Sequence, residues 1–194
     1  MRTFIAIDIL NVDKVVHLQN MIMKQFEFDR FNIRPVAKAN IHITIRFLGD
    51  IDESAIKDVT ENLSAMKFEP FEIRFIKAGC FPPNSTNPRV IWLGVDGPST
   101  EKLNNLYNII SKLLDQVNNK PNDRFQNYIT EEKTAFFPHI TLFRPRQRFK
   151  ISKTFNPDLL NINYADQVKN IKLKKSILTP EGPVYSDLLI IDAV

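Results

Sequence analysis

The order of apolar and polar residues predicts short strands and three amphipathic helices. Residues 2–9 alternate as a half-buried strand does, and apolar residues at 3.6-residue spacing predict a helix over 12–27. Asp52 is placed to cap a second helix, and a third is expected to begin near Ser99 or Thr100. Further strands are predicted at about 40–48, 71–78 and 89–95, from Phe136 onward, and at about 168–178 and 184–192. Because short turns join several of these strands, the pattern favours an α+β fold with antiparallel sheets and outer helices.

A tetrapeptide occurs twice among the predicted strands, as His42-Ile43-Thr44-Ile45 and His139-Ile140-Thr141-Leu142. On an extended strand, the His and Thr of each copy point to one face and the aliphatic residues to the other. The two copies lie half the chain apart, each with a helical pattern nearby. This spacing predicts a duplicated half, with residues 1–194 forming one domain of two lobes around a cleft.

Composition excludes some classes of protein but does not by itself identify a function. The 194 residues carry 26 Lys and Arg against 22 Asp and Glu, a net charge of +4 that leans only weakly toward a polyanionic partner. The single cysteine, Cys80, excludes an internal disulfide and a cysteine-based zinc site. Together with the absence of a recognisable signal peptide, it leads us to expect a cytoplasmic protein. No apolar run reaches membrane-spanning length, and no cofactor is expected.

Two histidines that face one cleft can serve as base and acid in a single displacement, since the imidazole titrates near neutrality. The threonine hydroxyls could then donate hydrogen bonds to phosphate oxygens as charge develops, which describes phosphoryl transfer without a metal. The alternatives are histidines that are merely buried, a metal site, and a nucleophilic threonine. Two histidines supply only half a zinc shell. A hydroxyl two residues along a strand is expected to run parallel to the ring rather than meet it.

These motifs resemble those of a known family, the 2H phosphoesterase superfamily, and within it the RNA 2′,3′-cyclic phosphodiesterases also described as 2′-5′ RNA ligases. The stretches that carry the resemblance are 42–49 and 137–144, each with the His-apolar-Thr-apolar signature, and the flanking segments 2–8, 88–94 and 176–185. The resemblance therefore spans nearly the whole chain.

The resemblance implies a bilobal LigT-like fold of two pseudo-symmetric lobes, each an antiparallel sheet, around a basic cleft. It also implies hydrolysis of RNA-terminal or nucleoside 2′,3′-cyclic phosphates to 2′-phosphates by His42 and His139, with ligation as the reverse reaction. In the family, an arginine at the position of Arg144 contacts phosphate or nucleotide. Strict alternation would turn Arg144 away from His139, so a bulge or strand end must re-aim it. Alternation also makes Arg46 a phosphate-binding candidate, beside Thr44.

The expected partners are RNA ends or cyclic nucleotides, bound by a monomer with no obligatory protein partner. Phe47, Phe81 and Phe143 are candidates to stack on a base. The basic residues after the second motif are candidates to contact RNA; they are Arg144, Arg146, Arg148, Lys150 and Lys153. Two rival functions stay open: a non-catalytic module that binds RNA ends, and a 2H enzyme acting on another phosphodiester such as 2′-5′ oligoadenylate.

Overall fold

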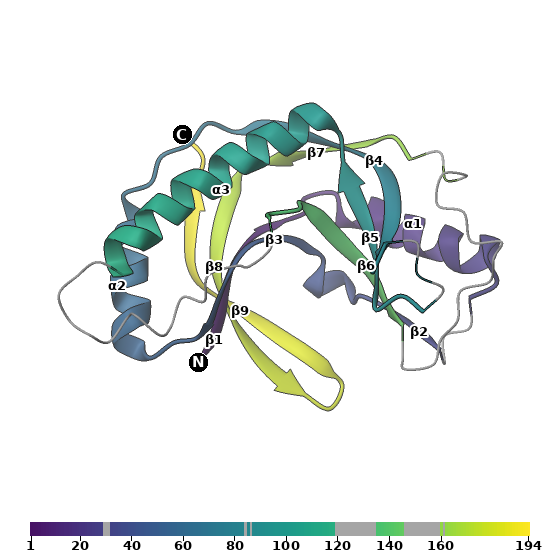
Figure 1. Ribbon diagram of the computed structural model, residues 1–194, viewed down its shortest axis with the longest axis horizontal. Helices are drawn as coiled ribbons and strands as arrows, with labels where there is room; N and C mark the ends of the chain where they lie inside the picture. The colour runs from purple at the N-terminus through teal and green to yellow at the C-terminus, as the bar shows by residue number, and fades with distance from the viewer. Residues whose placement is uncertain (29–31, 84, 86, 119–134, 146–159, 161) are drawn as a thin grey trace.

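The computed structural model describes residues 1–194 apart from 29–31, 84, 86, 119–134, 146–159 and 161. The helical elements are α1 (Val12–Gln25), η1 (Lys38–Asn40), α2 (Glu53–Ser64) and α3 (Gly97–Asn118). The strands are β1 (Arg2–Asp8), β2 (Ile33–Pro35), β3 (His42–Asp50), β4 (Phe71–Phe81), β5 (Val90–Val95), β6 (His139–Pro145), β7 (Tyr164–Val168), β8 (Asn170–Thr179) and β9 (Gly182–Asp192). The α+β class is confirmed (Figure 1).

The described strands form one antiparallel ladder in the order β7-β4-β5-β6-β3-β1-β8-β9, with β2 paired to β6. Four strands lie on each side of the junction between β6 and β3, so the strand order is symmetric about that junction. The expectation of two sheets needs one correction, because a single residue pair, Ile43 with Ile140, joins the two sides. That pair lies in the middle of both His-Thr motifs.

The two halves of the chain exchange strands. β4 follows β3 and α2 in sequence, yet it pairs with β5 and β7 on the far side of the junction. β8 comes from the second half of the chain and pairs with β1. Each side of the ladder therefore contains strands from both halves.

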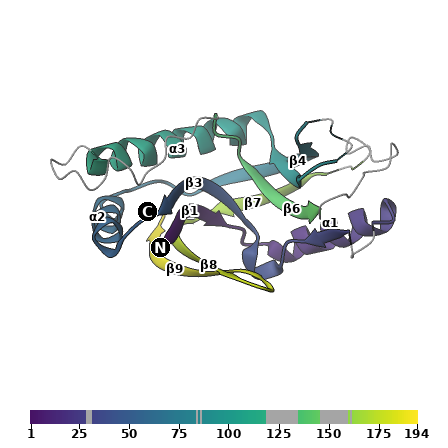
Figure 2. The same ribbon diagram turned by 60° about the horizontal axis from the view of Figure 1, so that its bottom comes forward.

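α2 and α3 begin where an aspartate side chain can accept a hydrogen bond from a free amide group of the first turn. Asp52 caps α2 as predicted, since its carboxylate accepts a hydrogen bond from the Ala55 amide at 2.8 Å. The third helix begins at Gly97, earlier than predicted, because Asp96 provides the cap by accepting from the Ser99 amide at 2.9 Å. α3 packs against α2 and β4, and α1 packs against β6 (Figures 1 and 2).

Two strands were not predicted from the pattern. β2 has only three residues and ends at Pro35. The buried face of β7 carries Asp166, which accepts a 2.6 Å hydrogen bond from Tyr164, so β7 lacks an apolar alternation. The second motif strand starts at His139 instead of Phe136, since Pro138 has no amide to donate.

Two further expectations concern the loop and basic residues of the second half and the lack of a membrane-spanning segment. The predicted loop after Asn118 and the basic residues Arg146, Arg148, Lys150 and Lys153 lie outside the described residues. Within the described part of the chain, no helix is both long enough and apolar enough to cross a bilayer.

The core lies behind the motifs. Ile43, Ile45, Ile140 and Leu142 are each 0–1% exposed and belong to one continuous apolar cluster. Because alternate residues of a strand point to opposite faces, burial of these aliphatic residues turns the histidines and threonines outward. The hydrophobic effect thus fixes the orientation of the candidate site.

Candidate active site

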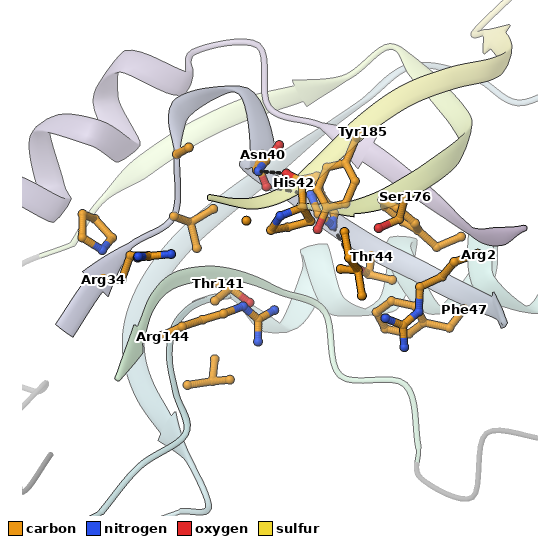
Figure 3. A pocket seen from close by; sticks show the side chains of 18 of the residues that line it. Arg2, Arg34, Asn40, His42, Thr44, Phe47, Thr141, Arg144, Ser176 and Tyr185 are labelled. Carbon is orange, nitrogen blue, oxygen red and sulfur yellow. Dashed lines mark hydrogen bonds between the residues drawn. The ribbon is translucent and has the colours of Figure 1, made fainter. Parts of the chain in front are cut away.

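Both His-Thr motifs line one cavity of about 1100 Å³. His42 and Thr44 reach it from β3, and His139, Thr141 and Arg144 reach it from the neighbouring strand β6. Figure 3 shows Thr141 and Arg144 on one strand and His42 and Thr44 on the next, with Arg34 at one end and Arg2 beside Phe47 at the other. Five of the six predicted site residues are therefore brought together.

The pairing of β3 with β6 relates the two motifs by a local twofold. In an antiparallel ladder such an axis passes through each residue pair, here Ile43 and Ile140. The residue before one isoleucine then lies across from the residue after the other. Each histidine accordingly sits across from the threonine of the other motif, and the four polar side chains form one quartet.

Each histidine is held by the same backbone contact. Nδ1 of His42 lies 2.8 Å from the carbonyl oxygen of Asn40, and Nδ1 of His139 lies 2.8 Å from that of Phe137. A carbonyl only accepts, so Nδ1 carries the proton in both neutral rings and Nε2 is the basic nitrogen. The fold thus fixes the tautomer of both rings in the form that a general base needs.

The Thr44 hydroxyl meets the His42 ring directly. Its Oγ1 lies 3.0 Å from Nε2, and with Nδ1 protonated the hydroxyl is the donor. The expectation that a hydroxyl two residues along the strand would miss the ring is wrong here. In the free protein, the basic nitrogen of His42 therefore accepts a hydrogen bond from Thr44.

Aromatic side chains surround both rings. Phe4 and Tyr185 contact His42 with centroid distances of 5.1 and 5.4 Å. Phe81 and Phe137 contact His139 at 5.3 and 5.9 Å. These rings shield both imidazoles from water, and such desolvation disfavours the charged form.

Burial lowers the pKa of both histidines. Desolvation is the largest cause and brings the pKa of His42 from 6.5 to about 4, although the Asn40 carbonyl and the Asp8 carboxylate act in the opposite direction. Desolvation also lowers the pKa of His139, with Arg144 adding to the fall. Both rings are therefore neutral at pH 7 in the free protein, and an acid role requires one ring to gain a proton with its substrate.

The surroundings of the two histidines are not equivalent. The cross-strand partner of His42 is Asp8, whereas the corresponding partner of His139 is Gly94. Asp8 accepts from two lysines at 2.9 and 3.0 Å, and the same lysines reach Asp187 at 2.8 and 2.7 Å. We call Asp8, Lys172, Lys174 and Asp187 the charge quartet. It gives His42 electrostatic surroundings that differ from those of His139.

A β-bulge at the fourth residue of each motif decides which side chains follow. On β3, Ile5 pairs with Arg46 and Ala6 with Thr44, which leaves Ile45 without a partner on β1. On β6, Ile91 pairs with Phe143 and Trp92 with Thr141, which leaves Leu142 without a partner on β5. The extra residue reverses the alternation at the same place in both strands.

The two bulges explain why Arg46 points away from the cavity and Arg144 points into it. Arg46 does not line the cavity, so its predicted placement beside Thr44 is wrong; its Nη1 donates to the Tyr107 hydroxyl at 2.6 Å instead. The next residue, Phe47, faces the cavity and is 55% exposed. Arg144 holds the equivalent place on β6 and also faces the cavity, re-aimed as the sequence required.

The other aromatic candidates differ in access. Phe143 is fully buried, so it is unable to stack on a bound base. Phe81 packs on His139 and Trp92. Phe47 is thus the most accessible of the three candidates.

The sequence did not single out three further residues of the cavity. Arg2, Arg34 and Tyr185 lie far apart in the chain and meet only in the folded structure. Arg34 pairs across the strands with Arg144, a like-charge neighbour. Only the resemblance of segments 2–8 and 176–185 to the family pointed toward Arg2 and Tyr185.

A metal would need ligands that the described residues do not bring together. No group of three or more His, Cys, Asp or Glu side chains with the geometry to hold an ion occurs among them. The polar lining of the cavity is mostly imidazole, hydroxyl and guanidinium groups, with the amide of Asn40 and one carboxylate, that of Glu181. Such groups suit an anionic ligand.

Comparison with known proteins supplies the family. The sequence model described as LigT like Phosphoesterase matches residues 13–92, which include the first motif. The chain is 31% identical to a protein of Archaeoglobus fulgidus named RNA 2′,3′-cyclic phosphodiesterase, with 99% of this chain and 100% of the relative covered. It is 33% identical to a Methanocaldococcus jannaschii protein of the same name, with 95% and 96% covered.

Solved structures agree with the fold. A protein of Thermus thermophilus superposes with a TM-score of 0.76 at 24% identity, covering 99% of this chain and 97% of that one. LigT of Escherichia coli complexed with 3′-AMP gives 0.74 at 23% identity, again covering 99% and 97%. With the sequence relatives at over 30% identity along nearly the full length, the chain belongs to the LigT-like family of 2H phosphoesterases.

Proposed function

We propose that this protein hydrolyses RNA-terminal or nucleoside 2′,3′-cyclic phosphates to 2′-phosphates, with His42 and His139 as the acid and base pair and without a metal. The observation that carries the proposal is the quartet of two histidines and two threonines in one cavity. The names of the relatives support the substrate class. One domain, with one motif from each of its two lobes, would suffice for this activity.

The reaction needs two proton transfers on opposite sides of phosphorus. One neutral imidazole takes a proton through Nε2 from a water molecule, whose oxygen attacks the phosphorus atom. The bond from phosphorus to O3′ breaks, and the other ring, as imidazolium, protonates O3′. The products are a 2′-phosphate and a free 3′-hydroxyl, so atoms and charges balance.

The other predicted residues stabilise the negative charge that grows on the phosphate oxygens. Thr44 and Thr141 donate to non-bridging oxygens, and Arg144 contacts the phosphate through its guanidinium. Thr44 must turn from Nε2 of His42 to do so, which also frees that nitrogen. The phosphate anion raises the pKa of nearby imidazole, so binding itself favours uptake of the proton that the acid requires.

The test is turnover of a 2′,3′-cyclic mononucleotide and of an RNA ending in a 2′,3′-cyclic phosphate, each in EDTA. We expect conversion to the 2′-phosphate, and a loss of about 10²- to 10⁴-fold in kcat for His42→Ala and for His139→Ala. His17→Ala is the matched control, because this third histidine is exposed on α1 outside the cavity. Circular dichroism of each variant checks that the fold is kept.

Other results of the same assays would contradict or extend the proposal. Loss of turnover in EDTA, restored by a divalent ion, would contradict metal independence. Binding of RNA ends without turnover would favour a non-catalytic module, and turnover of 2′-5′ oligoadenylate alone would favour another phosphodiester. Formation of a 2′-5′ bond from a cyclic phosphate end and a 5′-hydroxyl end would extend the proposal to reverse ligation.

A further inference from the structure

The cavity carries cationic side chains at both ends as well as at its centre. Arg144 lies among the motif residues, whereas Arg2 and Arg34 lie at opposite ends (Figure 3). Among the described lining residues only Glu181 is acidic. At about 1100 Å³ the cavity also slightly exceeds the usual 300–1,000 Å³ range of ligand sites. Its size and charge therefore suit a ligand with more than one phosphate.

The end near Arg34 is covered by the tip of the β8–β9 hairpin. Asn40 donates to the Pro183 carbonyl at 2.8 Å, and Arg34 donates to the Glu181 carbonyl at 3.3 Å. These two contacts fasten the tip to the segment that precedes the first motif. A polynucleotide chain leaving the cavity at this end would have to break them.

The other end is open as far as the described residues go, and it carries a cation that has no partner among them. Phe47 and Arg2 are both exposed there, and the Arg2 guanidinium makes no hydrogen bond or ion pair with any described residue. Its cross-strand neighbour Asp50 lies 3.9 Å from the terminal ammonium group of Met1 instead. The Arg2 guanidinium is therefore available to a ligand.

Tyr185 links this end to the centre of the cavity. Burial raises the pKa of its hydroxyl, and the positive charges of Arg144 and Arg2 partly offset that rise. Both guanidinium groups thus lie close enough to act on one phenol, which itself makes no hydrogen bond to a described residue. Arg144, Tyr185 and Arg2 therefore line the cavity from the motif residues toward the end that holds Phe47 (Figure 3).

We infer that Arg2, with the Tyr185 hydroxyl, binds the phosphate preceding the cyclic phosphate, so that the preferred substrate is an oligonucleotide end whose chain leaves past Phe47. This inference rests on the proposed function, because it takes the motif quartet as the site of the cyclic phosphate. A 2′,3′-cyclic phosphate closes the 3′ end of a chain, so only one neighbouring phosphate exists and only one end of the cavity needs to hold it.

The experiment compares kcat/KM on a 2′,3′-cyclic mononucleotide with kcat/KM on a tetranucleotide that ends in the same group. For Arg2→Ala we expect a loss of about 10- to 100-fold on the tetranucleotide and a change of less than about threefold on the mononucleotide, since a charge-assisted hydrogen bond is lost only on the longer substrate. The slope of log(kcat/KM) against log[salt] on the tetranucleotide should also become shallower by about 0.7.

Arg34→Ala and Arg74→Ala serve as comparison variants. Arg34 lies at the covered end, and Arg74 bonds Glu72 and Asn163 outside the cavity, so neither loss should fall selectively on the tetranucleotide. Equal losses on both substrates for Arg2→Ala, or no loss on either, would overturn the inference. A selective loss for Arg34→Ala in place of Arg2→Ala would do the same.

Failure of the proposed function itself gives a different result. The wild-type protein would then turn over neither substrate. Fluorescence anisotropy with a labelled tetranucleotide and a labelled mononucleotide, each ending in a 2′-phosphate, still tests the role of Arg2. Weaker binding by Arg2→Ala of the tetranucleotide alone supports the subsite, and unchanged or equally weakened binding overturns it.

Discussion

Burial of His42 should make the folded state sensitive to acid over a defined pH range. The pKa of the ring falls from 6.5 to about 4 in the folded protein, chiefly through desolvation. Below pH 6.5 the unfolded chain therefore binds a proton at this position, while the folded protein stays neutral there until about pH 4. Because the unfolded state binds more protons, stability falls as pH decreases through this window.

The size of the effect follows from the shift. At about 1.36 kcal/mol per pH unit, the unfolded state gains about 2.5 kcal/mol at this one position between pH 8 and about pH 4.5. The substitution His42→Asn removes the titrating group while keeping an amide that can donate to the Asn40 carbonyl. We expect the variant to lose about 2.5 kcal/mol less stability than the wild type over the same interval.

Urea unfolding at about pH 8 and pH 4.5, followed by circular dichroism, measures both free energies. Carboxylates that titrate in both proteins cancel in the comparison, and so does His139. His17→Asn provides the matched control for the loss of a histidine, since this residue is exposed on α1. Parallel pH dependence in the wild type and His42→Asn would refute the reasoning that burial controls this ring.

Three further pairs of variants separate the roles assigned above. Arg144→Ala should lower kcat/KM by about 10- to 100-fold, whereas Arg46→Ala should leave kcat/KM within about threefold and lower Tm instead, because Arg46 bonds Tyr107 outside the cavity. Asp8→Asn should lower the free energy of unfolding in urea by about 1–3 kcal/mol, because it leaves Lys172 and Lys174 partly unpaired. Asp13→Asn should lower it by less than about 1 kcal/mol, because the pair of Asp13 with Lys38 is exposed. Equal losses would contradict a structural role for the charge quartet. Gly79→Ala should lower the free energy of unfolding by about 1–3 kcal/mol, because the added methyl group would lie 2.3–2.8 Å from ring carbons of Trp92. Gly97→Ala has open space around it and should not destabilise the protein. A Gly79→Ala variant as stable as the wild type would show that the Trp92 ring moves freely.

The parts of the fold that follow local pattern were predictable from the sequence. The period of α1 and the cap at Asp52 depend on residues within a few positions of one another, and both occur as predicted. The face shared by His42 and Thr44 follows from strict alternation. Local rules fail when a partner strand changes the local geometry.

Arg46 and Arg144 show where such rules end. The bulges at Ile45 and Leu142 arise from pairing with β1 and β5, so no pattern within the motif itself reveals them. One bulge turns Arg46 away and the other brings Arg144 in. Arg2, Arg34 and Tyr185 were harder still, since each enters the cavity from a segment whose neighbours are distant in sequence.

The exchange of β4 and β8 between the two sides of the ladder has a consequence during synthesis. A ribosome that has released only the first half of the chain has delivered β1 to β5, but β4 lacks its partner β7, β5 lacks β6 and β1 lacks β8. A half-made protein lacks the second motif altogether, and its first motif lacks the neighbouring strand β6. The cavity with both motifs is therefore complete only once the C-terminal half of the chain is in place.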